Sequence, residues 1–397
     1  MDSHPGAYAG SAAWTPGPAW LSLSDMAKQR LVTGGALPGE EPLSGSSPVA
    51  PAKTEPAAGP SLRPTTLGDY VGQPKLIEKL AITLQAVRER GEPMEHVLLH
   101  GPPGLGKTTL AHLIAQRMGT HLTITSGPAL TRPTDLVGTL TRLQRGDVLF
   151  IDEVHRLSPV VEEYIYPAME DFRIDITLDS GLHARTVSMP LQPFTLIGAT
   201  TRAGLLSGPM RSRFGLVHNF DFYSEEELLT ILKRSAALLG VLGEGGDAGA
   251  LSALRALATR SRGTPRIANR LLRRVRDFAQ VRGDGRLSPS LVDEALLLEG
   301  IDALGLDELD RKYLRTIAGV YAGGPVGLEA VAATLGEDAG TLEDVVEPYL
   351  LQLGFVARTR KGRQLTRRAA EHLGIAWGAA EAAEGGLFDA DEAGAAD

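Results

Sequence analysis

Residues 101–108 read GPPGLGKT and match the phosphate-binding pattern G-x-x-x-x-G-K-T. Glycines such as Gly104 and Gly106 let the backbone wrap a triphosphate, so that several N–H groups point at its oxygens. Lys107 is long enough to reach the β- and γ-phosphates of ATP, and the Thr108 hydroxyl is a ligand for Mg²⁺. The alternative is a glycine-rich turn that binds no nucleotide.

A second group of chemically active residues lies at 149–153, which read LFIDE. In ATPases with this loop, the first acid after such a strand holds Mg²⁺ and the second polarises the attacking water as a general base. The pattern therefore predicts a metal-side carboxylate at Asp152 and a base at Glu153. A strand that merely ends in a solvated acidic pair is the structural alternative.

Three further residues fit an ATP site. The apolar run 195–199 ends at Thr200, whose hydroxyl is suited to hold the lytic water or to sense the γ-phosphate. Arg211 and Arg213 have no acidic residue nearby in the sequence, which suits an arginine offered to a neighbouring subunit's phosphate. Arg266 opens a later helix and could close over the nucleotide. Each assignment has a structural alternative. Thr200 could simply close a turn, Arg211 and Arg213 could be a solvated surface pair, and Arg266 could be one of several arginines without a role at the nucleotide.

The elements that must position these residues follow from the apolar pattern. Short apolar runs at 96–100, 148–151 and 195–199 predict strands of a parallel sheet that is buried on both faces. A helix predicted at 109–116 starts beside the phosphate loop, where its N-terminus favours an anion. Residues 61–223 therefore indicate an α/β domain. Ser224, followed by three glutamates, indicates a helix N-cap.

The rest of the chain divides by composition. Residues 224–302 are expected to be all-helical, with breaks at 243–249 and 263–265. Residues 303–375 predict helices at 307–321, 327–335 and 341–353, followed by a strand-turn-strand at 355–366. Residues 1–60 are rich in Pro, Gly, Ala and Ser and are expected to be disordered. The alternative is that the start codon is assigned too early and that Met26 is the true start. Residues 376–397 are expected to form an acidic flexible tail.

Composition narrows the function classes. The chain has 397 residues, a net charge of −8 and no cysteine, which excludes disulfides, thiolate metal sites and cysteine nucleophiles. The absence of cysteine fits a protein of the reducing cytoplasm. No apolar run is long enough to span a bilayer, so we expect no membrane partner. The predicted hairpin near the C-terminus is locally basic, with Arg358 and Arg363 among its cations, and this predicts sequence-independent binding to phosphates. A basic surface that serves only protein contacts is the alternative.

Together these motifs resemble those of an AAA+ ATPase, and more narrowly those of the RuvB family of bacterial Holliday-junction branch-migration motors. The similar segments carry the letters LRP at 62–64, DYVGQ at 69–73, GPPGLGKTTLA at 101–111, IDEVHRL at 151–157, YPAMEDF at 166–172, GATTRAG at 198–204, RGTPRIANRLLRRVRD at 262–277, AGGPVGL at 322–328 and EPYL at 347–350. The resemblance covers roughly residues 61–375.

The resemblance implies a large P-loop AAA+ domain (61–223), an all-α lid (224–302) and a winged-helix head (303–375). It implies an ATP hydrolase with Mg²⁺ that pumps duplex DNA and drives branch migration in recombination and repair. The implied partners are Holliday junctions, RuvA, RuvC and five further copies in a homohexamer. The implied nucleotide-site residues are Leu62, Arg63, Gly104, Gly106, Lys107, Thr108, Thr109, Glu170, Asp171, Phe172, Arg213, Tyr223 and Arg266. Arg358 and Arg363 match residues that touch the DNA backbone.

Three positions depart from the family pattern. Ala339 replaces a basic residue of the head, Ser212 replaces an acid between the two arginines, and Leu182-His183 replaces a small turn in the segment 175–190 that resembles the hairpin for RuvA. Two other readings stay open from the residues. Another AAA+ machine, such as a clamp loader or a protein unfoldase, fits less well with a basic winged head. A nucleotide-gated scaffold without turnover fits less well with Glu153 and Arg213.

Overall fold

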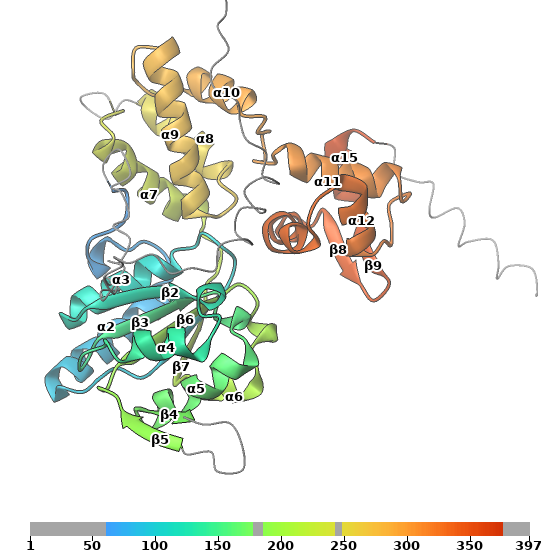
Figure 1. Cartoon of the computed structure of the whole chain (residues 1–397). Coiled ribbons are helices and arrows are strands. Elements are labelled where there is room, and N and C mark those ends of the chain that lie inside the picture. Colours follow the sequence, from blue (N-terminus) through green and yellow to red (C-terminus); the bar gives the residue numbers. More distant parts are fainter. Residues whose placement is uncertain (1–60, 178–185, 243–247, 376–397) are drawn as a thin grey trace, which may run out of the picture. The chain divides into compact units, whose positions relative to one another are not determined.

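A computed structural model describes residues 61–177, 186–242 and 248–375. The expectations for residues 1–60 and 376–397, for the break at 243–247 and for the turn at Leu182-His183 concern positions outside the described residues. Helices and strands are shown along the chain in Figure 1. Within the described part of the chain, no helix combines the length and apolar character needed to cross a bilayer.

A parallel sheet of five strands forms the centre of the first domain, in the order β2-β3-β6-β1-β7 (Figure 1). The predicted strands at 96–100, 148–151 and 195–199 are confirmed as β1, β3 and β6. Every residue of β6 is buried, as expected for a strand covered on both faces. The strands are β1 (Val97–His100), β2 (Leu122–Ser126), β3 (Val148–Asp152), β6 (Thr195–Thr200) and β7 (Leu216–Asn219).

Helices connect these strands, as parallel neighbours require. The helix predicted at 109–116 is the central part of α3, which begins directly at Lys107. An antiparallel hairpin of β4 (Arg173–Thr177) and β5 (Thr186–Pro190) is separate from the main sheet. The helices of this domain are α2 (Pro74–Arg90), α3 (Lys107–Met118), α4 (Pro133–Leu140), α5 (Pro159–Glu170) and α6 (Gly208–Ser212).

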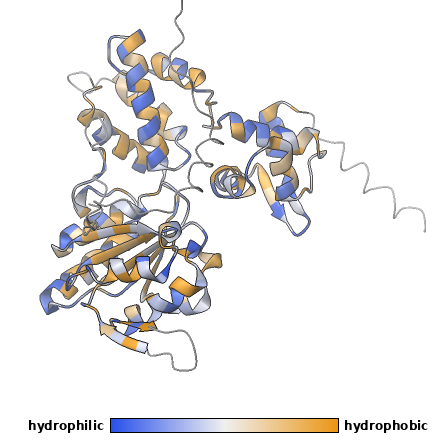
Figure 2. Ribbon diagram, viewed as in Figure 1, coloured by the Kyte–Doolittle hydropathy of each residue, from blue (hydrophilic) through white to orange (hydrophobic). Residues whose placement is uncertain are grey.

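The next region is all-helical among its described residues, with α7 (Glu225–Leu238), α8 (Ala248–Thr259), α9 (Pro265–Arg282) and α10 (Pro289–Leu298). The predicted cap at Ser224 is confirmed: its Oγ accepts the N–H of Glu227 at 3.3 Å, and the Glu227 carboxylate accepts the N–H of Ser224 at 2.8 Å. Hydrophilic and hydrophobic residues alternate along α9 in Figure 2. This pattern fits a helix that buries Leu271, Leu272 and Val275 on one face.

The C-terminal region has its own hydrophobic core. It contains α11 (Glu308–Gly319), α12 (Leu328–Leu335), α13 (Ala339–Thr341), a π-helical segment (Leu342–Val346), α14 (Glu347–Gln352), the antiparallel hairpin β8 (Val356–Thr359) and β9 (Gly362–Leu365), and α15 (Arg367–Leu373). The single α-helix expected at 341–353 is wrong in detail, because a π-helical turn interrupts it. Pro348 follows that turn and lacks the N–H that an uninterrupted α-helix would use.

Candidate nucleotide site and nucleic-acid interface

The phosphate loop lies between β1 and α3, and two of its glycines are required by close packing. Gly101 has a φ of 138°, and a Cβ added there would lie 2.6 Å from the backbone oxygen of Phe220. Gly104 has a φ of 80°, and its added Cβ would lie 2.8 Å from Thr264 Cγ2. Residues with a side chain rarely adopt such positive φ angles. Both the backbone angle and the lack of space for a Cβ therefore favour glycine at these two positions.

Lys107 lies inside the loop. Its Nζ donates hydrogen bonds to the backbone oxygens of Gly101 and Pro102, each at 2.8 Å. Burial of the ammonium lowers the pKa of Lys107 to about 8, while the nearby Asp152 carboxylate opposes this shift. A buried cation whose partners are two loop carbonyls is suited to an anionic ligand, because phosphate oxygens would replace these carbonyls as its partners.

The acid pair lies at the end of β3, as the sequence predicts. Asp152 Oδ1 accepts the backbone N–H of Glu153 at 3.0 Å. Glu153 has a φ of 49°, and its Oε2 lies 2.9 Å from Arg156 Nη1. Both side chains of the Glu153–Arg156 pair are about half exposed, at 45% and 58%. The base candidate is thus oriented by a neighbour and still accessible to water.

The residues fit a site for Mg²⁺ that is completed by a nucleotide. Among the described residues, no group of three or more His, Cys, Asp or Glu could hold a metal alone. Mg²⁺ usually takes one or two protein ligands together with phosphate oxygens and water. Asp152 and Thr108 would supply two such protein ligands. The Asp152 carboxylate lies close enough to Lys107, the residue before Thr108, to raise its pKa.

Thr200 ends β6 beside the acid pair. In the parallel register His100 pairs with Thr200, which places the ends of β1 and β6 together. The Thr200 Oγ1 lies 2.8 Å from His155 Nδ1 and also accepts the N–H of Arg202 at 3.0 Å. His155 follows the acid pair in the chain, but no local sequence pattern indicates its contact with Thr200. Thr200 therefore links β6 to His155 and Arg202 at this edge of the sheet. The hydroxyl of the next residue, Thr201, makes no hydrogen bond within the described residues.

Arg213 has an acidic partner in the folded chain, although no acid lies near it in the sequence. Its Nε lies 3.2 Å from Oε1 of Glu170, a residue 43 positions earlier that ends α5. Its guanidinium carbon lies 4.2 Å from the centre of the Tyr166 ring. Its Nη1 donates to the backbone oxygen of Pro209 at 2.7 Å. The folded chain supplies these partners from α5, which local sequence could not reveal.

The two residues that follow α5, Asp171 and Phe172, have other partners than Arg213. Asp171 pairs with Arg173 at 3.4 Å. The Phe172 ring lies edge-on to the rings of His96 and Phe194, with centroids 6.3 and 5.9 Å apart. Among the described residues, no hydrogen bond, ion pair or ring contact joins Glu170, Asp171 or Phe172 to residues 101–108. Their expected place at a nucleotide stays a prediction.

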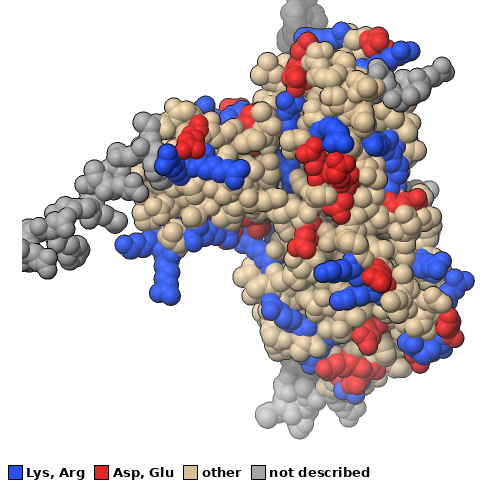
Figure 3. Space-filling model, turned by 180° about the vertical axis from the view of Figure 1, so that it is seen from behind, with Lys and Arg blue, Asp and Glu red and all other residues tan. Residues whose placement is uncertain are grey.

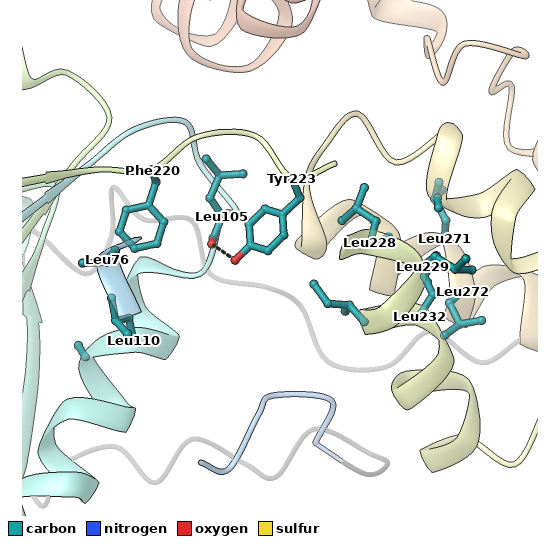
Figure 4. Close-up of a cluster of buried hydrophobic side chains, with 14 of the residues drawn as sticks. Leu76, Leu105, Leu110, Phe220, Tyr223, Leu228, Leu229, Leu232, Leu271 and Leu272 are labelled. Carbon is teal, nitrogen blue, oxygen red and sulfur yellow. Dashed lines mark hydrogen bonds between the residues drawn. The ribbon is translucent and has the colours of Figure 1, made fainter. Parts of the chain in front are cut away.

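Two residues outside the sheet also contact the phosphate loop: Tyr223, just before α7, and Arg266, in the first turn of α9. Tyr223 donates its hydroxyl to the Leu105 backbone oxygen at 3.1 Å (Figure 4). Burial raises the pKa of Tyr223 to about 12, so its phenol stays neutral. The backbone N–H of Arg266 donates to the oxygen of Gly104 at 3.3 Å. Both predicted residues thus contact the phosphate loop, Tyr223 through its side chain and Arg266 through its backbone.

The predicted adenine-side residues lie at the start of the described chain. Leu62 is 5% exposed, and its backbone oxygen accepts a hydrogen bond from Arg234 Nη2 at 3.3 Å. Arg63 is exposed. Burial lowers the pKa of His112 on α3, and the charge of Arg63 lowers it further. Arg63 therefore lies near the helix that follows the phosphate loop.

The basic hairpin predicted in the head is β8–β9, and lysine and arginine side chains project along one edge of the head in Figure 3. Arg358 and Arg363 face each other across the two strands. Both contact Glu347, which is fully buried. Ala339, one of the expected departures from the family pattern, begins α13. Ser212 donates its hydroxyl to the Pro209 oxygen at 3.0 Å and makes no contact with Arg213 among its described hydrogen bonds.

Comparisons with known proteins match the three regions one by one. The family model of the Holliday junction DNA helicase RuvB P-loop domain matches residues 62–220, that of the RuvB AAA lid domain matches residues 223–302, and that of the RuvB C-terminal winged helix domain matches residues 303–374. The matched residues include the phosphate loop, the acid pair, Arg213 and the β8–β9 hairpin.

Individual relatives agree with the family models. A "Holliday junction branch migration complex subunit RuvB" of Desulfosudis oleivorans is 56% identical over 335 residues, which are 84% of this chain and 96% of the relative. The solved structure titled "Thermotoga maritima RuvB Holliday junction branch migration motor" is 51% identical, with a TM-score of 0.72, and the match covers 79% of this chain and 99% of that one. A threonine-to-valine variant of Thermotoga maritima RuvB gives 50% identity and a TM-score of 0.71, covering 79% and 98%. The α/β domain with its phosphate loop, the helical lid and the winged helix are therefore those of a RuvB protein, and the chain belongs to this family.

Proposed function

We propose that this chain is an ATP-driven motor that moves duplex DNA and drives branch migration of Holliday junctions. The observation that carries the proposal is the combination of two sites in one chain. A hydrolytic edge gathers Lys107, the Asp152–Glu153 pair and Thr200, and a winged helix presents a basic hairpin. Membership in the RuvB family supports the same activity.

The residues of the edge have separable roles in hydrolysis. The loop N–H groups and the Lys107 ammonium bind the β- and γ-phosphates and orient them. Glu153 accepts a proton from the attacking water, since its carboxylate is accessible and held by Arg156. Thr108 and Asp152 would hold Mg²⁺, which neutralises charge on the phosphate oxygens when bound. Thr200 fixes His155 and the end of β6, and thereby the position of the water.

We further propose that Arg213 completes the site of a neighbouring copy. Its partners are Glu170, Tyr166 and Pro209, and none of them belongs to the phosphate loop. A homohexamer, the arrangement implied by the family, would place each Arg213 against the next subunit's phosphate. Glu170, Asp171 and Phe172 would approach the same nucleotide from this side, and Leu62, Arg63, Tyr223 and Arg266 from the other.

The remaining partners and boundaries belong to the same proposal. The β4–β5 hairpin, whose strand β5 is mostly exposed with Val187 at 47%, would contact RuvA, and RuvC would act on the same junction. Domain boundaries would fall near residues 61, 224, 303 and 375, in a cytoplasmic protein. Arg358 and Arg363 would contact the DNA backbone from the winged head.

The test is steady-state ATP hydrolysis with and without duplex DNA, together with strand exchange on a synthetic four-way junction. The proposal expects hydrolysis that DNA stimulates and junction migration that requires ATP. The Lys107→Ala variant is the control and should lose both, because the loop loses its cation. Hydrolysis that responds to a protein substrate instead of DNA would favour an unfoldase, and binding without turnover would favour a scaffold.

A further inference from the structure

We propose that Glu347 is a positioning residue for DNA binding, which holds Arg358 and Arg363 side by side in the orientation that contacts phosphate. The inference rests on the proposed DNA contact of these two arginines. Glu347 begins α14, and the arginines lie on the two strands of the neighbouring hairpin. All three residues lie within the winged head.

The two arginines cannot adopt this arrangement without help. Arg358 on β8 and Arg363 on β9 are direct partners in the antiparallel register. Like charges directly opposite each other destabilise a strand pair. The hairpin has two strands, and the β-bridge that Val326 forms with Arg363 adds an apolar neighbour and no negative charge. A carboxylate beneath both guanidinium groups removes this conflict.

Glu347 supplies that carboxylate with full hydrogen bonding. Its Oε1 accepts from Arg363 Nε at 2.8 Å and from the Tyr313 hydroxyl at 2.6 Å. Its Oε2 accepts from Arg358 Nε at 2.8 Å and lies 2.5 Å from Arg358 Nη2. The Glu347 side chain has no exposed surface. A buried carboxylate with four donors has one orientation, and so do the arginines that it binds.

The bonds leave an outward edge on each guanidinium. Arg358 is 43% exposed and Arg363 is 19% exposed, whereas Glu347 is fully buried. Burial alone would raise the pKa of Glu347, but the hydrogen bonds from Arg363, Tyr313 and Arg358 outweigh it and lower this pKa. The carboxylate therefore stays ionised beneath the two cations, and the exposed parts of both arginine side chains remain available to DNA.

The sign of one mutational effect separates positioning from simple charge. Glu347 is negative, so through-space electrostatics alone predicts that its removal strengthens DNA binding. Positioning predicts the opposite: Glu347→Gln frees the arginines to move apart and weakens binding although the head gains positive charge. The amide also offers N–H donors where Arg358 and Arg363 already donate, which disfavours the paired arrangement.

Glu343 is the matched control. Its Oε1 lies 3.9 Å from Arg358 Nη1 and 3.7 Å from Arg363 Nη2, and it is 34% exposed. Glu343→Gln removes the same charge beside the same arginines but none of their hydrogen bonds. Its other ion-pair partner, Arg202, keeps Asp344 at 2.6 Å. Glu343→Gln should therefore leave DNA affinity unchanged or raise it.

The experiment measures duplex DNA binding by the full-length variants through fluorescence anisotropy over a series of KCl concentrations. Each phosphate contact contributes about 0.9 to the slope of log K against log salt, which corresponds to roughly eightfold in affinity at 0.1 M salt. Glu347→Gln should lower the slope by one to two such contacts. An affinity that rises as in Glu343→Gln, with an unchanged slope, would overturn the positioning role.

A further variant separates positioning from stability. Tyr313→Phe removes one buried hydrogen bond to Glu347 and leaves both arginine contacts in place. It should lower the melting temperature of the head without changing the salt slope. A slope that falls as much in Tyr313→Phe as in Glu347→Gln would show that the loss reflects destabilisation alone.

Arg358→Gln tests the proposed contact between the hairpin arginines and DNA, on which the role of Glu347 depends. If this variant binds DNA with the wild-type slope, the proposed DNA contact itself fails. If Arg358→Gln loses slope and Glu347→Gln does not, the DNA contact stands and only the role of Glu347 fails.

Discussion

The guanidinium group of Arg213 lies on the face of the Tyr166 ring, with its central carbon 4.2 Å from the ring centre. Glu170 contacts the same arginine at 3.2 Å, and the Pro209 carbonyl accepts from its Nη1. Within the described residues, Nη2 has no hydrogen-bond partner. The side chain is thus held by its own subunit on three sides and keeps one donor edge for a ligand from outside.

Arg213 should act on the site of a neighbouring subunit. Arg213→Ala should lower ATP turnover by about 10³-fold or more, the usual effect of removing such an arginine. Mixing it with Lys107→Ala subunits should restore measurable hydrolysis, because some interfaces then combine an intact loop with an intact arginine. The measurement is ATPase rate against mixing ratio.

Arg213→Lys is the control for charge. It keeps the positive charge but loses the planar fork and the stacking on Tyr166, so it should rescue little activity. No recovery at any mixing ratio, in mixed rings shown to form, would contradict a role between subunits.

ATP binding should take up a proton near pH 8. Burial lowers the pKa of Lys107 from 10.5 to about 8 in the folded protein, and phosphate would raise it again. The unfolded chain therefore binds more protons between these two values, so the stability of the nucleotide-free protein rises with pH through this window. ATP affinity should fall as pH rises through 8, because less of the cation is present.

Calorimetry in two buffers of different ionisation enthalpy measures this proton. At pH 8 the uptake should be about half a proton per ATP, as expected for a group at its pKa. Lys107→Arg is the control, since arginine stays protonated and should take up none. A binding enthalpy for the wild type that is independent of buffer at pH 8 would contradict the shift.

Glu153→Gln should bind ATP and fail to hydrolyse it. The amide keeps the shape of the side chain but cannot accept the proton of the attacking water. A filter-binding assay should show ATP retained at near wild-type affinity, while phosphate release stops. Weak nucleotide binding by this variant would instead indicate a structural role, for instance through its contact with Arg156.

Local sequence patterns predicted much of this fold because the relevant interactions are local. The phosphate loop, the strand ends at Asp152 and Thr200 and the cap at Ser224 each depend on residues within a few positions of one another. The parallel sheet then brings the strand ends to one edge. For this reason Lys107, Asp152 and Thr200 could be grouped before any coordinates were known.

Long-range partners could not be predicted in the same way. Nothing in the residues around Arg213 indicates Glu170 or Tyr166, which belong to another helix. Glu347 was part of a recognisable motif, yet its burial beneath Arg358 depends on how α14 packs against the hairpin. Such pairs have no fixed spacing, so only the fold reveals them.

Gly104 should be required for the contact between the phosphate loop and the start of α9. An alanine Cβ at this position would lie 2.8 Å from Thr264 Cγ2 and 3.0 Å from Arg266 Cβ, at a φ of 80°. Relief of this collision would break the hydrogen bond from the Arg266 N–H to the Gly104 oxygen. Gly104→Ala should therefore weaken ATP binding by roughly tenfold or more, the equivalent of about 1.4 kcal/mol.

Gly119 at the other end of α3 is the matched control for backbone strain. Its φ of 73° is similar, but an added Cβ would meet no atom within 4 Å. Both variants share the cost of a left-handed alanine, about 1–2 kcal/mol. Only Gly104→Ala adds the collision, so titration with a fluorescent ATP analogue should show weaker binding for Gly104→Ala alone, while thermal unfolding of Gly119→Ala gives the cost of the backbone strain by itself. Equal ATP affinity in the two variants would mean that the α9 contact does not support nucleotide binding.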